Sequence, residues 1–256
     1  MSDVKLIQGD CLEVMQDLID DGVKVDMVLT DPPYGITKCK WDGVIPFNEM
    51  WGCLNKITNE NTPICLFDQE PFSSTLRMSN LENYKYDWIW DKGFCSNFTV
   101  AKYQPMCPYE IISVFYKKQC NYYPIKWQQT KKELVRDRAK TSRNLSVGVA
   151  EKYEYEYKDD GTRYPLRIIK ISGLGNETQK GKRVHPTQKP ISLLKYLIKT
   201  YTKEDDVVLD FTMGSGSTGV ACLQTNRNFI GIELEPKYYE IAKKRIKEAK
   251  AQRRLI

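Results

Sequence analysis

Two apolar segments of this chain each run directly into a turn built from proline or glycine. Residues 25–30 end in a turn at 31–34 (sequence DPPY), and residues 206–211, about 180 positions later, end in a turn at 212–216 (sequence TMGSG). Short β-branched runs that stop abruptly are typical of buried strands. A helical pattern follows the second turn, so the sequence predicts a strand–turn–helix unit of the kind that builds parallel sheets.

The turn at 31–34, here called the proline turn, is stiff and rich in hydrogen-bond acceptors. Pro32 and Pro33 fix φ and remove two backbone donors, so the carbonyl groups of this turn have no helix or strand ladder to join. Asp31 adds a carboxylate acceptor and Tyr34 adds a flat ring. Acceptors beside a stacking ring suit an aromatic base that carries an NH2 group, so these four residues are the candidate catalytic residues. An ordinary stop between strand and loop is the alternative.

The turn at 212–216, here called the glycine loop, favours close contact between backbone and ligand. Gly214 and Gly216 allow that approach, and the helix behind them offers free N–H groups. Another predicted strand ends in Glu233, and an acidic residue at this place can hold ribose hydroxyls. The spacing is not G-x-G-x-x-G, which favours a nucleoside cofactor smaller than a dinucleotide. A purely structural glycine turn is the alternative.

Four motifs in this order resemble those of DNA amino-methyltransferases in which the DPPY motif precedes the target-recognition region and the S-adenosylmethionine loop comes last. Besides the two turns, residues 9–10 are similar to the loop for the cofactor's adenine, and residues 185–190 (HPTQKP) to the segment that closes over its methionine end. The likeness is strongest to short adenine-N6 enzymes of phages and restriction systems. The cofactor-binding residues that it implies are Asp10, Cys11, Asp31, Thr187, Gln188, Lys189, Phe211, Met213, Gly214, Ser215, Gly216, Thr218 and Glu233.

The resemblance implies methyl transfer from S-adenosylmethionine to N6 of a flipped-out adenine in DNA. Asp31 and the Pro32 carbonyl would accept hydrogen bonds from the amine, and Tyr34 would stack on the base. Cytosine-N4 methylation is the first alternative, because the same geometry suits that amine, although cytosine-specific members more often carry Ser in place of Asp31. A catalytically idle DNA-binding subunit is the second. RNA or protein methylation is the third, but in those enzymes the cofactor loop normally precedes the proline motif.

Basic charge is concentrated in the middle of the chain. Residues 117–183 hold 17 Lys and Arg against 8 Asp and Glu, a net +9, so the remainder of this +6 chain carries −3. Such a balance is typical of a surface that follows phosphates. We therefore expect a catalytic domain formed by 1–117 and 184–256, and an inserted target-recognition region at 118–183. The candidate DNA-binding residues in it are Lys131, Lys132, Arg136, Arg138 and Arg143.

Alternating strand and helix patterns predict an α/β fold with a doubly wound, mostly parallel seven-stranded sheet of the Rossmann-like methyltransferase type. The expected strands lie near 4–8, 25–30, 63–67, 86–91, 110–116, 206–211 and 228–233. The expected helices lie near 11–20, 47–57, 71–79, 191–201, 217–225 and 236–252. Strands 25–30 and 206–211 should be neighbours at the middle of the sheet, where such folds bind ligands. The tryptophans of 88–92 suit either a base pocket or core packing.

The apolar pattern of the chain and its cysteine and histidine content bear on cellular location and on metal binding. The chain has no signal-peptide pattern and no apolar run of about 18 residues, so we expect a cytoplasmic protein without a membrane partner. Eight cysteines without a C-x-x-C pair and the single His185 give little support to a metal site. DNA is the expected partner, and a homodimer and a cognate restriction endonuclease remain open.

Overall fold

The computed structural model describes residues 2–36, 43–95, 98–129, 161–172 and 188–253. By their contacts the residues form two compact units, one of 1–123 with 167–256 and one of Pro124–Leu166. In the smaller unit, β6 (Trp127–Gln128) and β7 (Thr162–Arg163) pair antiparallel. The smaller unit lies within the predicted insertion, but 118–123 and 167–172 belong to the larger unit.

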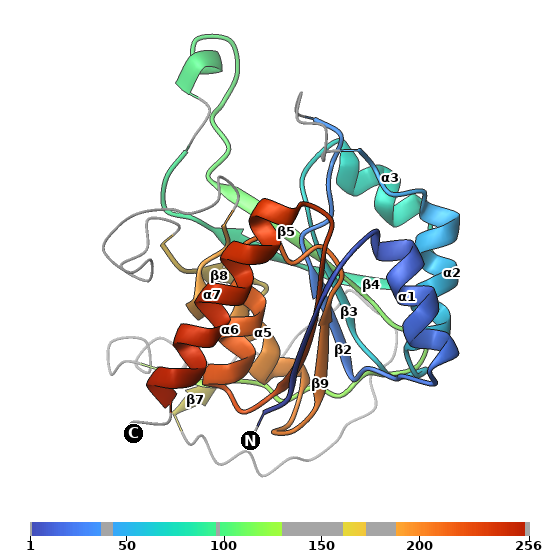
Figure 1. Cartoon of the computed structure of the whole chain (residues 1–256). Helices are drawn as coiled ribbons and strands as arrows, with labels where there is room; N and C mark the ends of the chain where they lie inside the picture. The colour runs from blue at the N-terminus through green and yellow to red at the C-terminus, as the bar shows by residue number, and fades with distance from the viewer. Residues whose placement is uncertain (1, 37–42, 96–97, 130–160, 173–187, 254–256) are drawn as a thin grey trace, which may run out of the picture. The chain divides into compact units, whose positions relative to one another are not determined.

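The larger unit is built on one sheet with two layers of helices (Figure 1). Every neighbouring pair of strands is parallel except the two pairs that involve β5. In spatial order the strands are β1 (Val4–Gln8), β10 (Asn228–Glu233), β9 (Val207–Asp210), β2 (Met27–Thr30), β3 (Ile64–Asp68), β5 (Tyr109–Phe115), β4 (Tyr84–Asp91) and β8 (Ile168–Lys170).

All seven expected strands are present, and β2 and β9 are neighbours as predicted, with Val28 opposite Leu209. The expected count of seven strands was wrong by one, because β8 adds an edge strand beside β4 through the pair Ile89 and Ile168. The three residues of β8 are too few to show a periodic pattern, and they lie within the predicted insertion at 118–183. They form a strand because they pair with the edge of β4, and this contact between distant segments has no local sequence signal.

Helices cover both faces of this sheet (Figure 1). Apolar side chains alternate along the strands, so Val28 and Leu209 belong to one hydrophobic cluster, whereas Met27 and Val208 belong to the other. The first cluster packs against α1 (Cys11–Asp20), α2 (Phe47–Ile57) and α3 (Phe72–Met78). The second packs against α5 (Ile191–Tyr201), α6 (Ser217–Gln224) and α7 (Pro236–Arg253).

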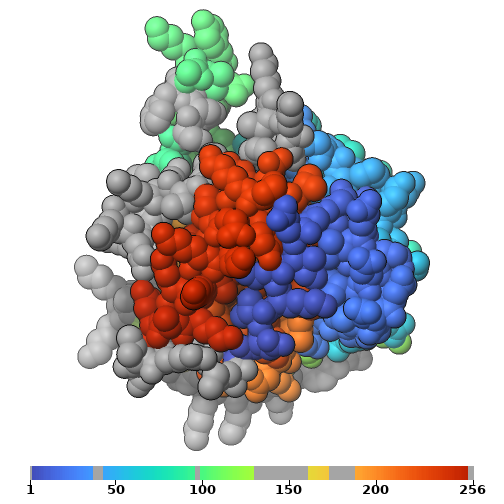
Figure 2. Space-filling model, viewed as in Figure 1, coloured from blue at the N-terminus to red at the C-terminus, as the bar shows by residue number. Residues whose placement is uncertain are grey.

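Figure 2 shows α7 (red) against the N-terminal part of the chain (blue). The Tyr239 hydroxyl of this helix donates to the carbonyl of Leu6 in β1, at 3.3 Å. No helix in the described ranges has the length and apolarity needed to cross a bilayer.

The sheet changes its winding direction between β9 and β2. The chain leaves β2 towards α2 and β3 on one side, and leaves β9 towards α6 and β10 on the other. Loops that diverge in this way leave a crevice at the carboxyl ends of the two strands. The proline turn follows β2 and the glycine loop follows β9, so the fold brings the two motifs together.

Candidate active site

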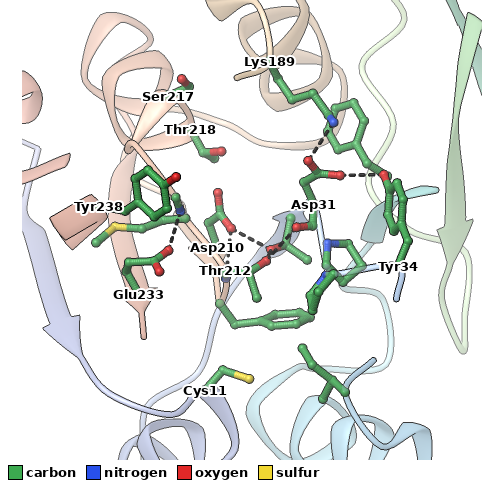
Figure 3. A pocket seen from close by; sticks show the side chains of 18 of the residues that line it. Cys11, Asp31, Tyr34, Lys189, Asp210, Thr212, Ser217, Thr218, Glu233 and Tyr238 are labelled. Atoms are coloured by element: carbon green, nitrogen blue, oxygen red, sulfur yellow. Dashed lines mark hydrogen bonds and ion pairs between the residues drawn. The ribbon is translucent and has the colours of Figure 1, made fainter. Parts of the chain in front are cut away.

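A pocket of about 620 Å³ lies at this edge of the sheet (Figure 3). It is lined by the glycine loop, residues 9–12 at the start of α1, Glu233 and Tyr238, and by the proline turn, Trp90, Glu110 and Lys189. Of the predicted cofactor residues, the pocket is lined by Asp10, Cys11, Asp31, Gln188, Lys189, Phe211, Met213, Gly214, Ser215, Thr218 and Glu233. Thr187 and the basic residues 131, 132, 136, 138 and 143 lie outside the described residues.

Hydroxyl and carboxyl groups at the ends of β2 and β9 tie the two turns together. The Thr30 hydroxyl donates to Asp210 Oδ1 at 2.6 Å and lies 2.6 Å from the Thr212 hydroxyl. Thr212 in turn donates to the Asp31 carbonyl at 3.0 Å. Burial of Asp210 raises its pKa to about 6, with the hydrogen bonds from Thr218 and Thr30 opposing that rise. This network fixes the spacing between the two predicted motifs.

Glu233 is held by two backbone donors, one from the glycine loop and one from the turn that follows β10. The Gly214 N–H donates to its Oε2 at 2.8 Å, and the Glu235 N–H donates to its Oε1 at 2.9 Å. Burial nevertheless raises the pKa of this carboxyl. Each carboxylate oxygen has a second acceptor position, so Glu233 can also accept hydrogen bonds from a ligand.

Gly216 is the N-cap of α6, has φ +76°, and lies where the glycine loop contacts α7. A Cβ atom at this position would lie 2.9 Å from the Ala242 Cβ of α7. Arg245, also in α7, donates to the Ser215 carbonyl at 2.6 Å and to its hydroxyl at 2.8 Å. The final helix therefore holds the glycine loop in place.

Asp10 and Cys11 begin α1 at the floor of the pocket. The Asp10 carboxylate caps the helix, accepting from the N–H groups of Leu12 at 2.8 Å and Glu13 at 3.4 Å. Burial raises the pKa of the Cys11 thiol to about 12, so this cysteine is a neutral packing group.

The Asp31 carboxylate already has hydrogen-bond donors from its own chain on both oxygens. The Tyr34 hydroxyl donates to Oδ1 at 2.6 Å, and the Lys189 ammonium donates to Oδ2 at 2.7 Å (Figure 3). The Tyr34 ring stacks on Phe72 with centroids 5.0 Å apart. Burial raises the pKa of Asp31, and Lys189 opposes that rise. The proline turn is thus a constrained site that presents one acidic group.

Lys189 and Glu110 are the main differences from the sequence-based site. Lys189 lines the pocket, as its predicted cofactor role requires, and its ammonium lies between Asp31 and Glu110. Glu110 was missed, although a charged residue near the start of the apolar strand 109–115 was a usable signal. Because β5 is antiparallel, its first residues lie at the same edge as the ends of the parallel strands.

Both tryptophans of β4 are buried in the same hydrophobic cluster, and only Trp90 also lines the pocket. Trp88 is buried in the core, where its indole N–H donates to the Tyr201 hydroxyl at 2.7 Å. Trp90 lines the pocket, and its indole N–H donates to the Ile171 carbonyl at 2.8 Å. Lys92, two residues further along, also lines the pocket.

Comparison with known proteins agrees with this geometry. The N6_N4_Mtase family model, described as DNA methylase, matches residues 25–244, which include the proline turn, the glycine loop and Glu233. The chain belongs to this DNA methylase family. The resemblance recognised from the motifs is therefore confirmed at the level of a DNA amino-methyltransferase.

Two curated relatives illustrate how far the similarity extends. The type II methyltransferase M2.MboI of Moraxella bovis is 27% identical over 261 residues, covering 95% of this chain and 87% of that protein. The type II methyltransferase M.HinfI of Haemophilus influenzae is 49% identical over 72 residues, which is 28% of this chain and 20% of that protein.

Solved structures share the architecture. The M1.HpyAVI–SAM complex is 26% identical, with a TM-score of 0.65 over 95% of this chain and 98% of that one. The cytosine-N4-specific PvuII DNA methyltransferase is 15% identical, with a TM-score of 0.62 over 98% of this chain and 93% of that one. The second likeness concerns the fold alone.

Proposed function

We propose that this DNA methyltransferase transfers a methyl group from S-adenosylmethionine to N6 of adenine within one short DNA sequence. The observation that carries the proposal is the half-buried Asp31 carboxylate, held by Thr212 and Lys189 beside the glycine loop. A carboxylate only accepts hydrogen bonds, whereas the serine that is more frequent in cytosine-specific members also donates. An acceptor-only group suits an exocyclic amine with two N–H donors, and the choice of adenine over cytosine rests on the presence of Asp31 where cytosine-specific members more often carry Ser.

The cofactor side of the pocket fits a nucleoside with a sulfonium side chain. Glu233 offers acceptors for ribose hydroxyls, and the glycine loop allows close backbone approach at Gly214, which lines the pocket without a side chain. The likeness to the SAM complex of M1.HpyAVI supports the same cofactor here. The bound sulfonium supplies an activated methyl group, so the protein mainly has to align donor and acceptor.

On the base side, the proline turn would hold the target amine. The N6 lone pair of adenine is delocalised into the ring, which makes the amine a weak nucleophile. Asp31 Oδ1 has a second acceptor position beside its bond from the Tyr34 hydroxyl. Hydrogen bonds to this oxygen and to the Pro32 carbonyl would favour a tetrahedral nitrogen whose lone pair faces the methyl group, with the Tyr34 ring against the base.

Methylome sequencing of expressing cells tests this proposal. In a host without adenine methylation of its own, we expect N6-methyladenine at one position of one short sequence. The Asp31→Ala variant, expressed at the same level, is the matched control and should leave that position unmodified. N4-methylcytosine at a fixed sequence, with unmodified adenine, would contradict the adenine assignment.

The basic middle segment is the proposed DNA-facing surface. Neutralising Lys131, Lys132, Arg136 and Arg138 together should flatten the salt dependence of DNA binding, because each lost phosphate contact removes about 0.9 from the log–log slope. Filter binding or fluorescence anisotropy across a salt series measures this slope. The control neutralises Lys243, Lys244 and Lys247 of α7. Equal slopes for the middle-segment variant and the unaltered protein would place the DNA contacts elsewhere.

Exchanging the middle segment tests recognition separately from affinity. Replacing 118–183 with the corresponding segment of a relative should change the methylated sequence. An unchanged sequence would move specificity to the loops around 38–42 and 94–103. The homodimer, the cognate endonuclease and the cytoplasmic location stay predictions.

A further inference from the structure

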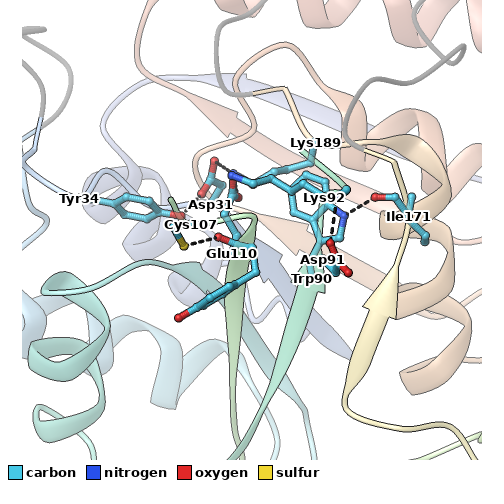
Figure 4. Close-up of polar contacts among 11 residues, drawn as sticks. Asp31, Tyr34, Trp90, Asp91, Lys92, Cys107, Glu110, Ile171 and Lys189 are labelled. Carbon is cyan, nitrogen blue, oxygen red and sulfur yellow. Dashed lines mark hydrogen bonds and ion pairs between the residues drawn. The ribbon is translucent and has the colours of Figure 1, made fainter. Parts of the chain in front are cut away.

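Four charged side chains of alternating sign lie in a row beside the proline turn (Figure 4), here called the charge row. The Lys189 ammonium lies 2.7 Å from Asp31 Oδ2 and 3.0 Å from Glu110 Oε2. Glu110 Oε1 lies 3.1 Å from the Lys92 ammonium. The Lys189 side chain is 10% exposed and that of Glu110 17%, so both pairs are shielded from water. The charge row therefore ends at the candidate catalytic carboxylate of Asp31.

The four residues of the charge row come from separate parts of the fold. Asp31 follows β2, Glu110 belongs to β5, Lys92 follows β4 and Lys189 lies two residues before α5. Their meeting depends on the antiparallel direction of β5. Two positive and two negative groups are balanced here, so removing one of them leaves an uncompensated buried charge.

We propose that Glu110 is a positioning residue for methyl transfer, which shares the Lys189 ammonium with Asp31 and thereby determines how strongly that ammonium holds the catalytic carboxylate. The inference rests on the catalytic role proposed for Asp31. Glu110 acts through Lys189, and Lys92 holds Glu110 from the other side.

The charges around Asp31 decide the direction of each effect. Burial raises the pKa of Asp31, Lys189 lowers it and Glu110 raises it. Burial also raises the pKa of Glu110, but Lys189 and Lys92 bring it below its ordinary value. The other titratable groups that act on this site are Tyr34 of the same turn, Asp210 of β9 and Asp68 of β3.

Two substitutions in the charge row should shift the pKa of Asp31 in opposite directions. Glu110→Gln removes a negative charge and leaves Lys189 to Asp31 alone, so the pKa of Asp31 should fall. Lys92→Met leaves Glu110 less compensated, so Glu110 should draw Lys189 away and the pKa of Asp31 should rise. Shifts of about one pH unit are expected from a neighbouring charge at these distances.

The pH dependence of single-turnover methylation, with saturating DNA and cofactor, measures these shifts. The acid limb should move to lower pH in Glu110→Gln and to higher pH in Lys92→Met, while Glu110→Asp should stay near the wild-type profile. Glu60→Gln, at an exposed ion pair with Lys118, is the matched control and should leave the profile unchanged. An acid limb of Glu110→Gln that stays in place or moves to higher pH overturns the proposal.

A second readout does not depend on turnover. Carbon-detected NMR titration of the Asp31 carboxyl, assigned with Asp31→Asn, reports its ionisation in the free enzyme. A lower pKa in Glu110→Gln supports the inference even if the methylated base proves to be cytosine. An unchanged pKa overturns it even if the product is N6-methyladenine, so this result and the failure of the proposed function can be told apart.

Discussion

Asp31→Ala should reduce methyl transfer at least about a hundredfold, the scale of losing a positioned polar group in a catalytic site. The substitution removes the carboxylate that would accept from the target amine, and leaves Lys189 paired with Glu110. Cofactor affinity should change much less, because Glu233 and the glycine loop are held by their own hydrogen bonds. The expected result is therefore slow chemistry on a bound cofactor.

Single-turnover kinetics and isothermal titration with S-adenosylmethionine measure the two quantities separately. Asp17→Ala, on the exposed face of α1, is the matched control and should keep both. Near-normal turnover in Asp31→Ala would show that the carboxylate has no catalytic role. A parallel loss of turnover and cofactor affinity would move Asp31 from the base side to the cofactor side.

Gly216→Ala should destabilise the protein for two reasons, backbone strain at a positive φ and overpacking against α7. An L-residue at φ +76° costs about 1–2 kcal/mol in backbone strain. The new Cβ would also lie 2.9 Å from Ala242 Cβ and 3.1 Å from Ile246 Cδ1, and such overpacking typically costs about 1–3 kcal/mol more. The two costs add to about 2–5 kcal/mol. Cofactor affinity should also fall, because the strain enters the glycine loop.

Gly22→Ala separates the two causes. Gly22 has φ +73°, but a Cβ there would meet nothing within 4 Å, so only the backbone cost of about 1–2 kcal/mol applies. Urea denaturation gives the free energy of unfolding for both variants. Equal losses would mean that α7 moves away easily and does not hold the glycine loop.

The parts of the fold that the sequence predicts are those with local signals. Residues 25–30 and 206–211 are apolar, β-branched and followed by proline or glycine, and each became a strand that ends in its motif. The predicted helices follow equally local patterns of spacing. The adjacency of β2 and β9 could be predicted because doubly wound sheets have one place where their winding reverses.

The parts that the sequence does not predict depend on contacts between distant residues. β8 forms by pairing with the edge of β4, and its three residues alone are too few to predict a strand. The ion pair between Glu110 and Lys189 depends on the antiparallel direction of β5, which the strand pattern alone leaves undetermined. The motif around Lys189 likewise does not predict that its ammonium pairs with both Asp31 and Glu110.

The identity of the methylated nucleoside tests the central claim most directly. Purified protein, methyl-labelled S-adenosylmethionine and mixed-sequence DNA are incubated together, and the DNA is digested to nucleosides and separated. We expect the label in N6-methyladenine. Label in N4-methylcytosine with none in N6-methyladenine would contradict the adenine assignment, and label in RNA or protein with none in DNA would contradict the proposed function itself.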